Sequence, residues 1–369
     1  MHTEEEPSNR HPASGHPGRA SLAQVAAAAR VSPSTVSHAL NGTRAVRAET
    51  RERVARAVEQ LGYVQHRVAR AKRRTAVVGV AFDGIADTPF AGRIMRGAQE
   101  VAREHGTLLL VVDSDGDPEL EERHLRSLAE RRVDGILLAR NVHQEVDRPA
   151  GFGDIPVVLI GATPESGWIV PAVAPDEHAL AEAATAHLLA AGHRRLAFIT
   201  AMGDTPVTRG RHTGFRSAIE WAGLYDRHAV VERTSPDAAG GRRMGRRLLD
   251  QPPGERPTGI VCYNAQVAMG VYQAAESVGL EVPRDCSIVG IGDLEVISAA
   301  LDPGLTTMAL PHLEMGRRAM ATLLEIIAGT AADVAGPVLL AGPVLLAGEL
   351  VERRSVAPPR RLMGWLNRR

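Results

Sequence analysis

The chain has few aromatic residues, two cysteines and one lysine, and each shortage excludes a class of protein. Phe, Trp and Tyr make up 3% of the 369 residues, which leaves few rings for stacking on a sugar. Cys262 and Cys286 cannot form a disulfide framework, and both are expected to stay reduced in the cytoplasm. The only lysine, Lys72, stands between Ala71 and Arg73, so the Gly-Lys-Ser/Thr cradle of a P-loop is absent.

Other catalytic and membrane signatures are missing as well. No apolar run reaches the ~18 residues of a membrane span, and the Glu- and Pro-rich start lacks the apolar segment of a signal peptide. The chain has no Gly-x-Gly-x-x-Gly after its first strand, no His-Glu-x-x-His, no Cys-x-x-Cys and no Gly-x-Ser-x-Gly. We therefore expect no enzyme, no metal, no cofactor and no membrane partner.

The net charge of zero hides an uneven distribution. Residues 1–75 hold 13 Lys and Arg against 6 Asp and Glu, a net charge of +7, and the remainder carries −7. A basic block at one end indicates a polyanionic partner, and an acidic remainder indicates a soluble body.

Residues 31–42 carry the clearest functional signal, a short helix with two different faces. Ser32 can cap this helix and Pro33 can occupy its first turn. Val36 and Leu40 lie on one face, and short hydrogen-bonding side chains occupy the other. Such a polar face can enter a DNA major groove, although a solvated serine-rich face is the plain alternative.

The flanking segments complete a three-helix arrangement. Residues 21–29 predict a helix in which Ser21 and Gln24 have the spacing of a capping box, and a two-residue turn follows. Residues 48–61 predict a third, amphipathic helix. Three short helices with a tight turn between the first two are typical of a helix-turn-helix DNA-binding domain.

From residue 76 the pattern changes to alternating strands and helices. Strands are expected at residues 77–81, 108–112, 135–138, 157–160, 196–200, 259–263 and 287–291, and helices at residues 91–105, 118–131, 178–191, 208–221 and 265–279. This alternation occurs in two successive blocks. It predicts an α/β body of two doubly wound parallel sheets, with a cleft between the two lobes.

The order of motifs resembles the lactose-repressor (LacI/GalR) family. In the headpiece the matching residues are Leu22, Val25-Ala26, Val31-Ser-Pro-Ser-Thr-Val-Ser, Leu40-Asn-Gly, Thr50-Arg-Glu-Arg-Val and Leu61-Gly-Tyr63. In the body they include Arg132-Val-Asp-Gly135, Gly192-His-Arg-Arg, Gly214-Phe, Ser287-Ile-Val-Gly and Leu305-Thr-Thr. The resemblance covers about residues 21–354. It implies a body like a periplasmic sugar-binding protein, with three crossings between lobes near residues 175, 306 and 338.

We accordingly expect five parts along the chain. These are a disordered tail (1–19), the headpiece (20–63), a basic hinge (64–75), a two-lobed effector-binding and dimerisation domain (76–354) and a basic tail (355–369). Lobe 1 would comprise about 76–175 and 307–337, and lobe 2 about 176–306 and 338–354. Gly336-Pro-Val-Leu-Leu-Ala341 is repeated directly as Gly342-Pro-Val-Leu-Leu-Ala347, so one copy suffices for the last strand and the other is an insertion without an assigned role.

The resemblance implies which residues contact DNA. Those at the family's base-reading positions are Pro33, Ser34 and His38. Those suited to phosphate contacts and capping are Ser21, Ser32, Thr35, Ser37 and Asn41. Those in the basic hinge are Arg67, Arg70 and Lys72. Lys72 stands where the family inserts an apolar wedge, which favours phosphate neutralisation over kinking of the DNA.

The resemblance also implies an effector site in the cleft. Its expected side chains are Asp83, Phe90, Arg211, Asn264 and Asp293. Gly161 and Gly292 replace aspartates that family members often carry. Two effector classes remain open, a sugar or an anionic, less hydroxylated metabolite that pairs with Arg211 and Arg209.

We therefore expect a cytoplasmic, homodimeric, sequence-specific transcription regulator. It would repress from a pseudo-palindromic operator under the control of a small-molecule effector. The last residues lack the heptads of a tetramerising coiled coil, which favours a dimer. An alternative is a small-molecule-binding protein whose headpiece is vestigial, and a DNA-binding assay separates the two.

Overall fold

The computed structural model describes residues 22–32, 35–36, 48–61, 75–86, 90–165, 167–224, 229–329 and 342–360. The chain divides into two compact units, Met1–Arg74 and Thr75–Arg369. Among the described residues, no helix has the length and apolar character needed to cross a membrane.

The first unit is the headpiece, and a small apolar core holds its helices together. Helices α1 (Leu22–Ala29) and α3 (Ala48–Leu61) contact each other. The buried side chains of this core are Val25, Ala26, Ala29, Val36, Val54 and Ala57. Ser32 caps the turn before Val36, because its Oγ accepts a hydrogen bond from the backbone N–H of Thr35 at 3.1 Å. The predicted Ser32 cap and the predicted apolar stripe of residues 48–61, at Val54, Ala57 and Val58, are therefore confirmed. Leu40, predicted to share the face of Val36, lies outside the described residues.

The second unit contains two six-stranded sheets, which define lobe 1 and lobe 2. The sheet of lobe 1 has the order β11-β5-β4-β3-β1-β2, and the sheet of lobe 2 has the order β12-β10-β9-β8-β6-β7. Every pairing is parallel except that of β12 with β10. The predicted fold class, a helix-turn-helix headpiece with a two-lobed α/β body, is confirmed.

The elements of lobe 1 are β1 (Val77–Phe82), α5 (Phe90–Glu104), β2 (Leu108–Asp113), α6 (Pro118–Glu130), β3 (Gly135–Val146), β4 (Val157–Pro164), β5 (Ala172–Pro175), α12 (His312–Ala328) and β11 (Val344–Leu346). The elements of lobe 2 are α7 (Glu177–Ala190), β6 (Leu196–Ala201), α8 (Pro206–Trp221), β7 (Ala229–Thr234), α9 (Ala238–Leu249), β8 (Gly259–Cys262), α10 (Ala265–Ser277), β9 (Ser287–Ile291), α11 (Glu295–Ser298), β10 (Thr306–Ala309) and β12 (Glu349–Val351).

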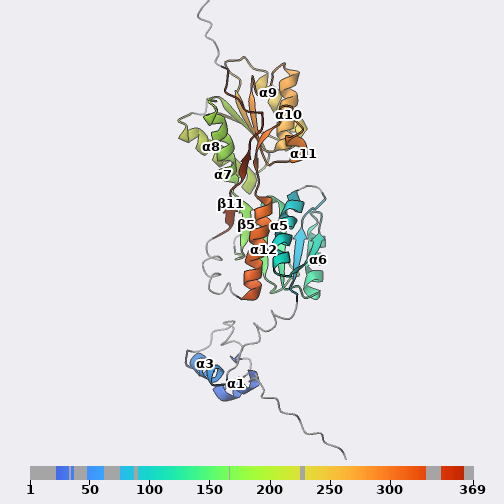
Figure 1. The fold of residues 1–369 in the computed structure, drawn as a ribbon, viewed down its shortest axis with the longest axis vertical. Coiled ribbons are helices and arrows are strands. Elements are labelled where there is room, and N and C mark those ends of the chain that lie inside the picture. The colour runs from blue at the N-terminus through green and yellow to red at the C-terminus, as the bar shows by residue number, and fades with distance from the viewer. Residues whose placement is uncertain are drawn as a thin grey trace, which may run out of the picture. The chain divides into compact units, whose positions relative to one another are not determined.

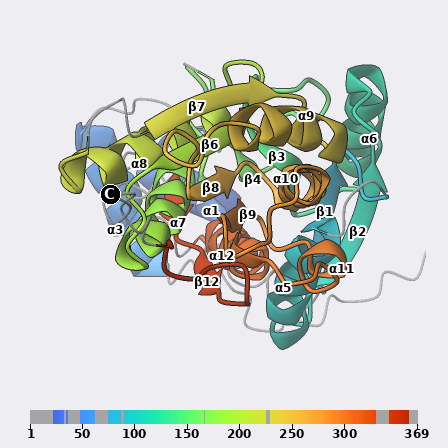
Figure 2. The ribbon, with the colours of Figure 1, turned by 90° about the horizontal axis from the view of Figure 1, so that it is seen from above.

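Helices cover both faces of each sheet, because the central strands are buried runs of Val, Ile, Leu, Phe and Ala. In lobe 1, α5 and α12 pack on one face and α6 on the other. In lobe 2, α7 and α8 pack on one face and α9 and α10 on the other, as Figure 2 shows. Each lobe therefore has a core on either side of its sheet.

Helices α5 and α12 lie side by side (Figure 1) and approach closely at two glycines. A Cβ on Gly97 would collide with the carbonyl oxygen of Leu313, and one on Gly316 with that of Ile94. α12 returns to lobe 1 after the chain has built most of lobe 2. The two glycines thus permit a tight contact between segments more than 200 residues apart.

The strand pairing places two of the three crossings of the chain between the lobes at other residues than expected. The first lies between β5 and α7, at Asp176. β10 belongs to the sheet of lobe 2, so the second crossing lies at Leu310–Pro311 rather than near residue 306. β11 pairs with β5 of lobe 1, so the third lies at Ala347–Gly348 rather than near residue 338. β11 is the second copy of the repeat, and the first copy lies outside the described residues.

Residues 355–360, expected to begin a basic tail, belong to lobe 2. Ser355 is fully buried, and its Oγ accepts from the N–H of Thr306 at 2.8 Å and donates to the carbonyl of Ile288 at 2.6 Å. The carbonyl of Ala357 accepts from Ser287 Oγ at 3.1 Å. The boundary at residue 354 was wrong because these bonds join distant parts of the chain, which local composition does not reveal.

Candidate effector cleft and nucleic-acid interface

The side chains expected to hold an effector lie where parallel strands and their helices meet. Asp83 follows β1, Asn264 follows β8 and Asp293 comes two residues after β9. Phe90 begins α5 and Arg211 lies in the second turn of α8. Ligands of open α/β sheets bind outside the carboxyl ends of the strands, which is where these residues lie.

Arg211 is buried and paired within lobe 2. Its Nε donates to Glu177 Oε2 at 2.7 Å, and both side chains are more than nine-tenths buried. Its Nη1 donates to the carbonyl of Tyr263, and its guanidinium lies over the Tyr263 ring, 4.6 Å from the centroid. Because Glu177 already neutralises Arg211, this arginine offers no unpaired positive charge to an anionic effector.

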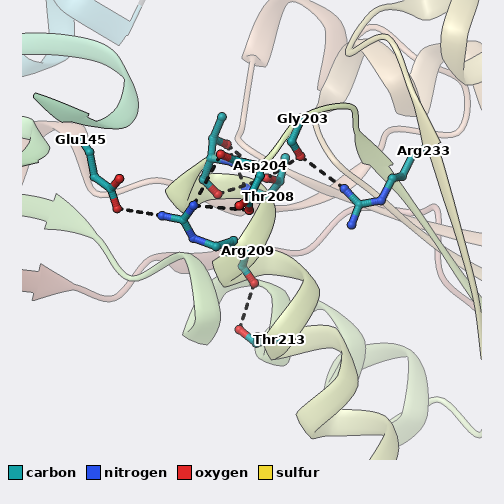
Figure 3. Close-up of polar contacts among 8 residues, drawn as sticks. Glu145, Gly203, Asp204, Thr208, Arg209, Thr213 and Arg233 are labelled. Atoms are coloured by element: carbon teal, nitrogen blue, oxygen red, sulfur yellow. Dashed lines mark hydrogen bonds and ion pairs between the residues drawn. The ribbon is translucent and has the colours of Figure 1, made fainter.

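Arg209 is also paired, and its ion pair joins the two lobes (Figure 3). Its Nη2 donates to Glu145 Oε1 of β3 at 2.7 Å, and its Nη1 lies 3.3 Å from Asp204 Oδ1. All three side chains are substantially exposed. The structure therefore does not favour the expectation of an anion held by Arg211 and Arg209, since both meet carboxylates of the chain itself.

A bulge in β3 changes the lobe 1 side of the cleft. β3 and β4 pair in register up to Ala139 and Ile160 and resume at Gln144 and Ala162, so four residues of β3 oppose the single Gly161. Gly161 has φ +65°, and a Cβ there would lie 2.5 Å from the carbonyl oxygen of Arg140. The bulge thus explains why a glycine, and not an aspartate, stands at this position within β4.

The bulge ends at His143, whose imidazole lacks partners. Both ring nitrogens are inaccessible to solvent and make no hydrogen bond within the described residues. Burial lowers the pKa of His143, and the charges of Glu177 and Arg211 in lobe 2 act on it in opposite directions. The ring is therefore neutral at pH 7, with one N–H donor and one acceptor left without partners. Buried polar groups are rarely left unpaired, so His143 is a candidate for binding a ligand.

Asp83 faces a cavity of about 510 Å³ in lobe 1. Its Oδ1 accepts from the N–H of Asn141 at 2.9 Å, and its Oδ2 accepts from Gln144 Nε2 at 3.1 Å. Burial raises the pKa of the Asp83 carboxyl. The remaining charged residues that line the cavity are Asp117, Glu121, Glu122, Arg140 and Asp147. Arg140 is paired with Glu121 at 2.7 Å, so carboxylate acceptors dominate this cavity.

Phe90 packs against a buried histidine. Its ring stacks on His312, with centroids 4.6 Å apart and planes 21° apart. Burial lowers the pKa of His312 to about 4, and the positive charges of Arg93 and Arg211 act in the same direction. The stack therefore presents two neutral rings, one from the start of α5 and one from the start of α12.

Asn264 and Asp293 already have structural partners. Asn264 caps α10, with its Oδ1 accepting from the N–H of Val267 at 2.7 Å and its Nδ2 donating to the carbonyl of Pro236 at 2.8 Å. Asp293 Oδ1 accepts from Arg353 Nη1 at 2.9 Å and from Thr307 Oγ1 at 3.0 Å. Arg353 and Thr307 hold the pKa of the Asp293 carboxyl below its usual range, against the effect of burial.

Of the residues predicted to contact DNA, the structure describes only Ser32 and Thr35. Ser32 is exposed, and Thr35 is half-buried beside it, their hydroxyls 2.8 Å apart. The other residues predicted to contact DNA lie outside the described residues: Ser21, Pro33, Ser34, Ser37, His38, Asn41, Arg67, Arg70 and Lys72. Within the described part of the chain, no three His, Cys, Asp or Glu residues are grouped so that they could hold a metal ion.

Sequence reasoning missed His143, Glu177 and His312. His312 stands at the start of a helix that was not predicted, and Glu177 follows a strand end without a motif. His143 depends on the pairing of β3 with β4, for which the local pattern carried no signal because the strand was expected to end at Leu138.

Two family models match the chain. One described as "Bacterial regulatory proteins, lacI family" matches residues 21–66, and one described as "Periplasmic binding protein-like domain" matches residues 185–356. These two segments correspond to the headpiece and to much of lobe 2 with α12.

Curated relatives and solved structures match nearly the same span. The HTH-type transcriptional repressor PurR of Haemophilus influenzae (strain PittEE) is 33% identical over 314 residues, 84% of this chain and 91% of the relative. The ribose operon repressor of Haemophilus influenzae is 32% identical over 317 residues, 84% of this chain and 92% of the relative. A LacI-family regulator from Rhizobium etli has a TM-score of 0.68 at 30% identity and covers 77% of this chain and 100% of that one. The transcriptional regulator CelR, in complex with cellobiose, has a TM-score of 0.60 at 27% identity and covers 92% of this chain and 100% of that one.

Proposed function

Because this chain belongs to the LacI family of bacterial regulatory proteins, we propose that it is a cytoplasmic, homodimeric repressor of a pseudo-palindromic operator, controlled by an uncharged effector held between its lobes. Its relatives are DNA-binding transcriptional repressors, and like them it is not an enzyme. What we propose beyond family membership is the symmetric operator, the homodimer and the class of effector.

The proposal of DNA recognition rests on the positions of Ser32 and Val36 at the start of the predicted second helix. Ser32 caps it and Val36 is fully buried in the headpiece core. With Val36 facing inward, a helix that continues as the sequence predicts would direct positions 34, 38 and 41 to the opposite side. Those positions carry Ser34, His38 and Asn41, which can contact base edges and phosphates.

An edge strand supports the dimer. β2 forms the outer edge of the lobe 1 sheet, and none of its six residues is fully buried. Leu108 and Val111 expose 52% and 40% of their surface there. A free edge with exposed apolar side chains is a surface that proteins usually cover, and a second copy related by two-fold symmetry would cover it.

The charges of the cleft support an uncharged effector. Arg211 and Arg209 are neutralised by carboxylates of the chain, and the Asp83 cavity is lined mostly by acceptors. Hydroxyl donors suit such acceptors, and the imidazole of His143, with neither ring nitrogen bonded, can accept one hydrogen bond and donate another. Cellobiose bound to CelR and the name of the ribose operon repressor agree with a hydroxylated ligand.

Selection of DNA from a random pool tests the repressor proposal directly. The full chain should enrich a two-fold symmetric sequence, and His38→Ala should lower its affinity for that sequence by about 1–3 kcal/mol while relaxing one base position per half-site. Equal losses on every duplex would contradict base reading by His38. No enrichment at low salt would favour the alternative of a vestigial headpiece.

Calorimetry with a panel of neutral sugars and small carboxylates tests the effector class. We expect heat of binding from at least one neutral, hydroxylated compound. Tight binding of a carboxylate together with no binding of any neutral compound would contradict the proposal, because it would require Arg211 or Arg209 to release its partner.

A further inference from the structure

An apolar groove runs along the outer surface of lobe 2, away from the ends of the strands that form the cleft. α7 and α8 form it, and its volume is about 650 Å³. Its lining residues are Ala179, Glu182, Ala183, Ala186, Leu189, Ala190, Arg194, Ala218, Trp221 and Ala222. Eight of these ten side chains are apolar, so the groove is suited to apolar side chains of an occupant.

The rim of the groove carries a large exposed aromatic residue. Trp221, at the end of α8, exposes 90% of its surface. The outward side of α7 is also apolar at Ala183, Ala186 and Ala190, although its inward side is already buried in the core. A helix that is apolar on both sides is normally covered on both. Within the described residues, nothing covers Trp221.

The described chain passes the end of this groove. The carbonyl of Ala357 accepts hydrogen bonds from Ser287 Oγ and His193 Nε2, and its N–H donates to Ser287 Oγ. These bonds hold Ala357 at the end of lobe 2 where α7 finishes. Pro359 then lies 3.6 Å from the Cβ position of Gly192, two residues beyond the groove residue Ala190. Arg360 is anchored to Asp285 at 3.2 Å. The described chain therefore passes close to the C-terminal end of α7, which forms one wall of the groove.

The nine residues that follow are unusually basic for this protein, and four of them have large apolar side chains. The sequence 361–369 reads Arg-Leu-Met-Gly-Trp-Leu-Asn-Arg-Arg and holds one of the three tryptophans of the chain. An extended stretch of nine residues spans roughly 30 Å, and the 14 residues of α7 span about 21 Å. The segment is therefore long enough to follow the groove along its whole length.

We propose that residues 361–369 dock into the groove between α7 and α8 of the same copy of the chain. Leu362, Met363, Trp365 and Leu366 supply the apolar side chains that would cover the alanines and Trp221. Glu182 on the groove, with a half-exposed carboxylate, lies within reach of the basic residues of the segment. Docking in the same copy is favoured because the chain arrives at the groove and needs no linker.

A disulfide trap tests this assignment in the full-length protein. Ala183→Cys, Ala186→Cys and Ala190→Cys are each combined with Leu366→Cys and oxidised mildly. The native thiols of Cys262 and Cys286 do not compete, since both are buried and burial raises the pKa of each. The matched control is Ala239→Cys with Leu366→Cys, because Ala239 is an exposed alanine of α9, on the other face of the lobe.

We expect at least one groove pair to crosslink about tenfold faster than the control, in a product of single-chain mass. Equal rates for groove and control would overturn the proposal. A product of twice the chain mass would overturn docking within one copy and assign the groove to a second copy.

Limited trypsin digestion gives a readout that does not depend on new cysteines. Ala186→Arg fills the groove at an exposed position, and Trp365→Ala removes the main apolar side chain of the segment. Both should speed cleavage after Arg361 about tenfold relative to the unchanged chain, while Ala239→Arg should not. Identical cleavage rates in all four proteins would overturn the proposal.

Discussion

Lobe 1 and lobe 2 share one sheet order but satisfy their cleft-facing polar groups differently. In lobe 2 the cleft groups are bonded within the lobe: Arg211 to Glu177, Asn264 to α10 and Asp293 to Arg353. In lobe 1 the bulge of β3 leaves both nitrogens of His143 without partners. In lobe 2 these side chains therefore already have their bonding partners. In lobe 1, His143 offers one donor and one acceptor that a ligand could bind.

This difference locates the determinants of specificity. A residue whose bonds are already made contributes shape and charge, whereas a buried residue with missing bonds gains them only when the right ligand arrives. Changes in lobe 2 should thus act mainly on stability, and changes at His143 mainly on effector binding. Variants on the two sides of the cleft separate these two effects.

The largest expected effect is the loss of the buried ion pair of lobe 2. Arg211→Ala leaves the Glu177 carboxylate, 3% exposed, without its partner. Breaking such a pair should lower the free energy of unfolding by about 3–5 kcal/mol, measured by urea denaturation. The double variant Arg211→Leu with Glu177→Leu should recover most of this loss. An unchanged urea midpoint for Arg211→Ala would show that the pair is not buried in solution.

Acid sensitivity should arise from one buried histidine in each lobe. Burial lowers the pKa of His193 in lobe 2 and of His312 in lobe 1 to about 4. Both imidazoles stay neutral in the folded chain but take up a proton in the unfolded chain, so stability is present above about pH 6.5 and is lost as the pH falls towards 4.

His312→Phe should preserve the stack on Phe90 and remove one of these two contributions. Between pH 7 and pH 4.5 the unfolding free energy of both proteins should fall. The fall should be smaller in His312→Phe than in the unchanged chain, by about 1–3 kcal/mol, as measured by thermal unfolding. Parallel pH profiles for the two proteins would contradict the assignment to His312.

His143→Leu should sharpen the contrast between the lobes. It removes a buried group that lacks hydrogen bonds, so the free energy of unfolding without effector should stay equal or rise by about 1 kcal/mol. Effector affinity should fall about 10- to 100-fold, measured by calorimetry. His187→Leu is the matched control, because Nε2 of His187 in α7 also lacks a partner. A loss of effector affinity in His187→Leu as large as that in His143→Leu would contradict the role of His143.

The sequence predicted most elements that depend on local pattern, although helices α9 and α12 were missed, and it did not reveal features that depend on pairing. Buried apolar runs and helix caps such as Ser32 identified the headpiece and most strands, because these signals lie within a few residues of each other. The bulge that positions His143 depends on β4, which lies about twenty residues farther along the chain. The repeat of Gly-Pro-Val-Leu-Leu-Ala offers two identical candidates for β11, and only pairing with β5 distinguishes them.

The smallest expected effect concerns the ion pair between the lobes. Arg209 and Glu145 are about half exposed, so Glu145→Gln should lower the free energy of unfolding by less than about 1 kcal/mol, and by less still at high salt. A double-mutant cycle with Arg209→Gln measures the coupling between the two side chains. A coupling above about 2 kcal/mol would show that this contact, and not the bound effector, is the main link between the lobes.

Effector titration in the presence and absence of the selected operator is the most direct test of control by the cleft. If cleft and headpiece are coupled, operator DNA changes the effector Kd by about 5- to 150-fold, and effector changes the operator Kd by the same factor. An effector Kd that is identical with and without operator, under conditions where both ligands bind, would contradict the proposed regulation.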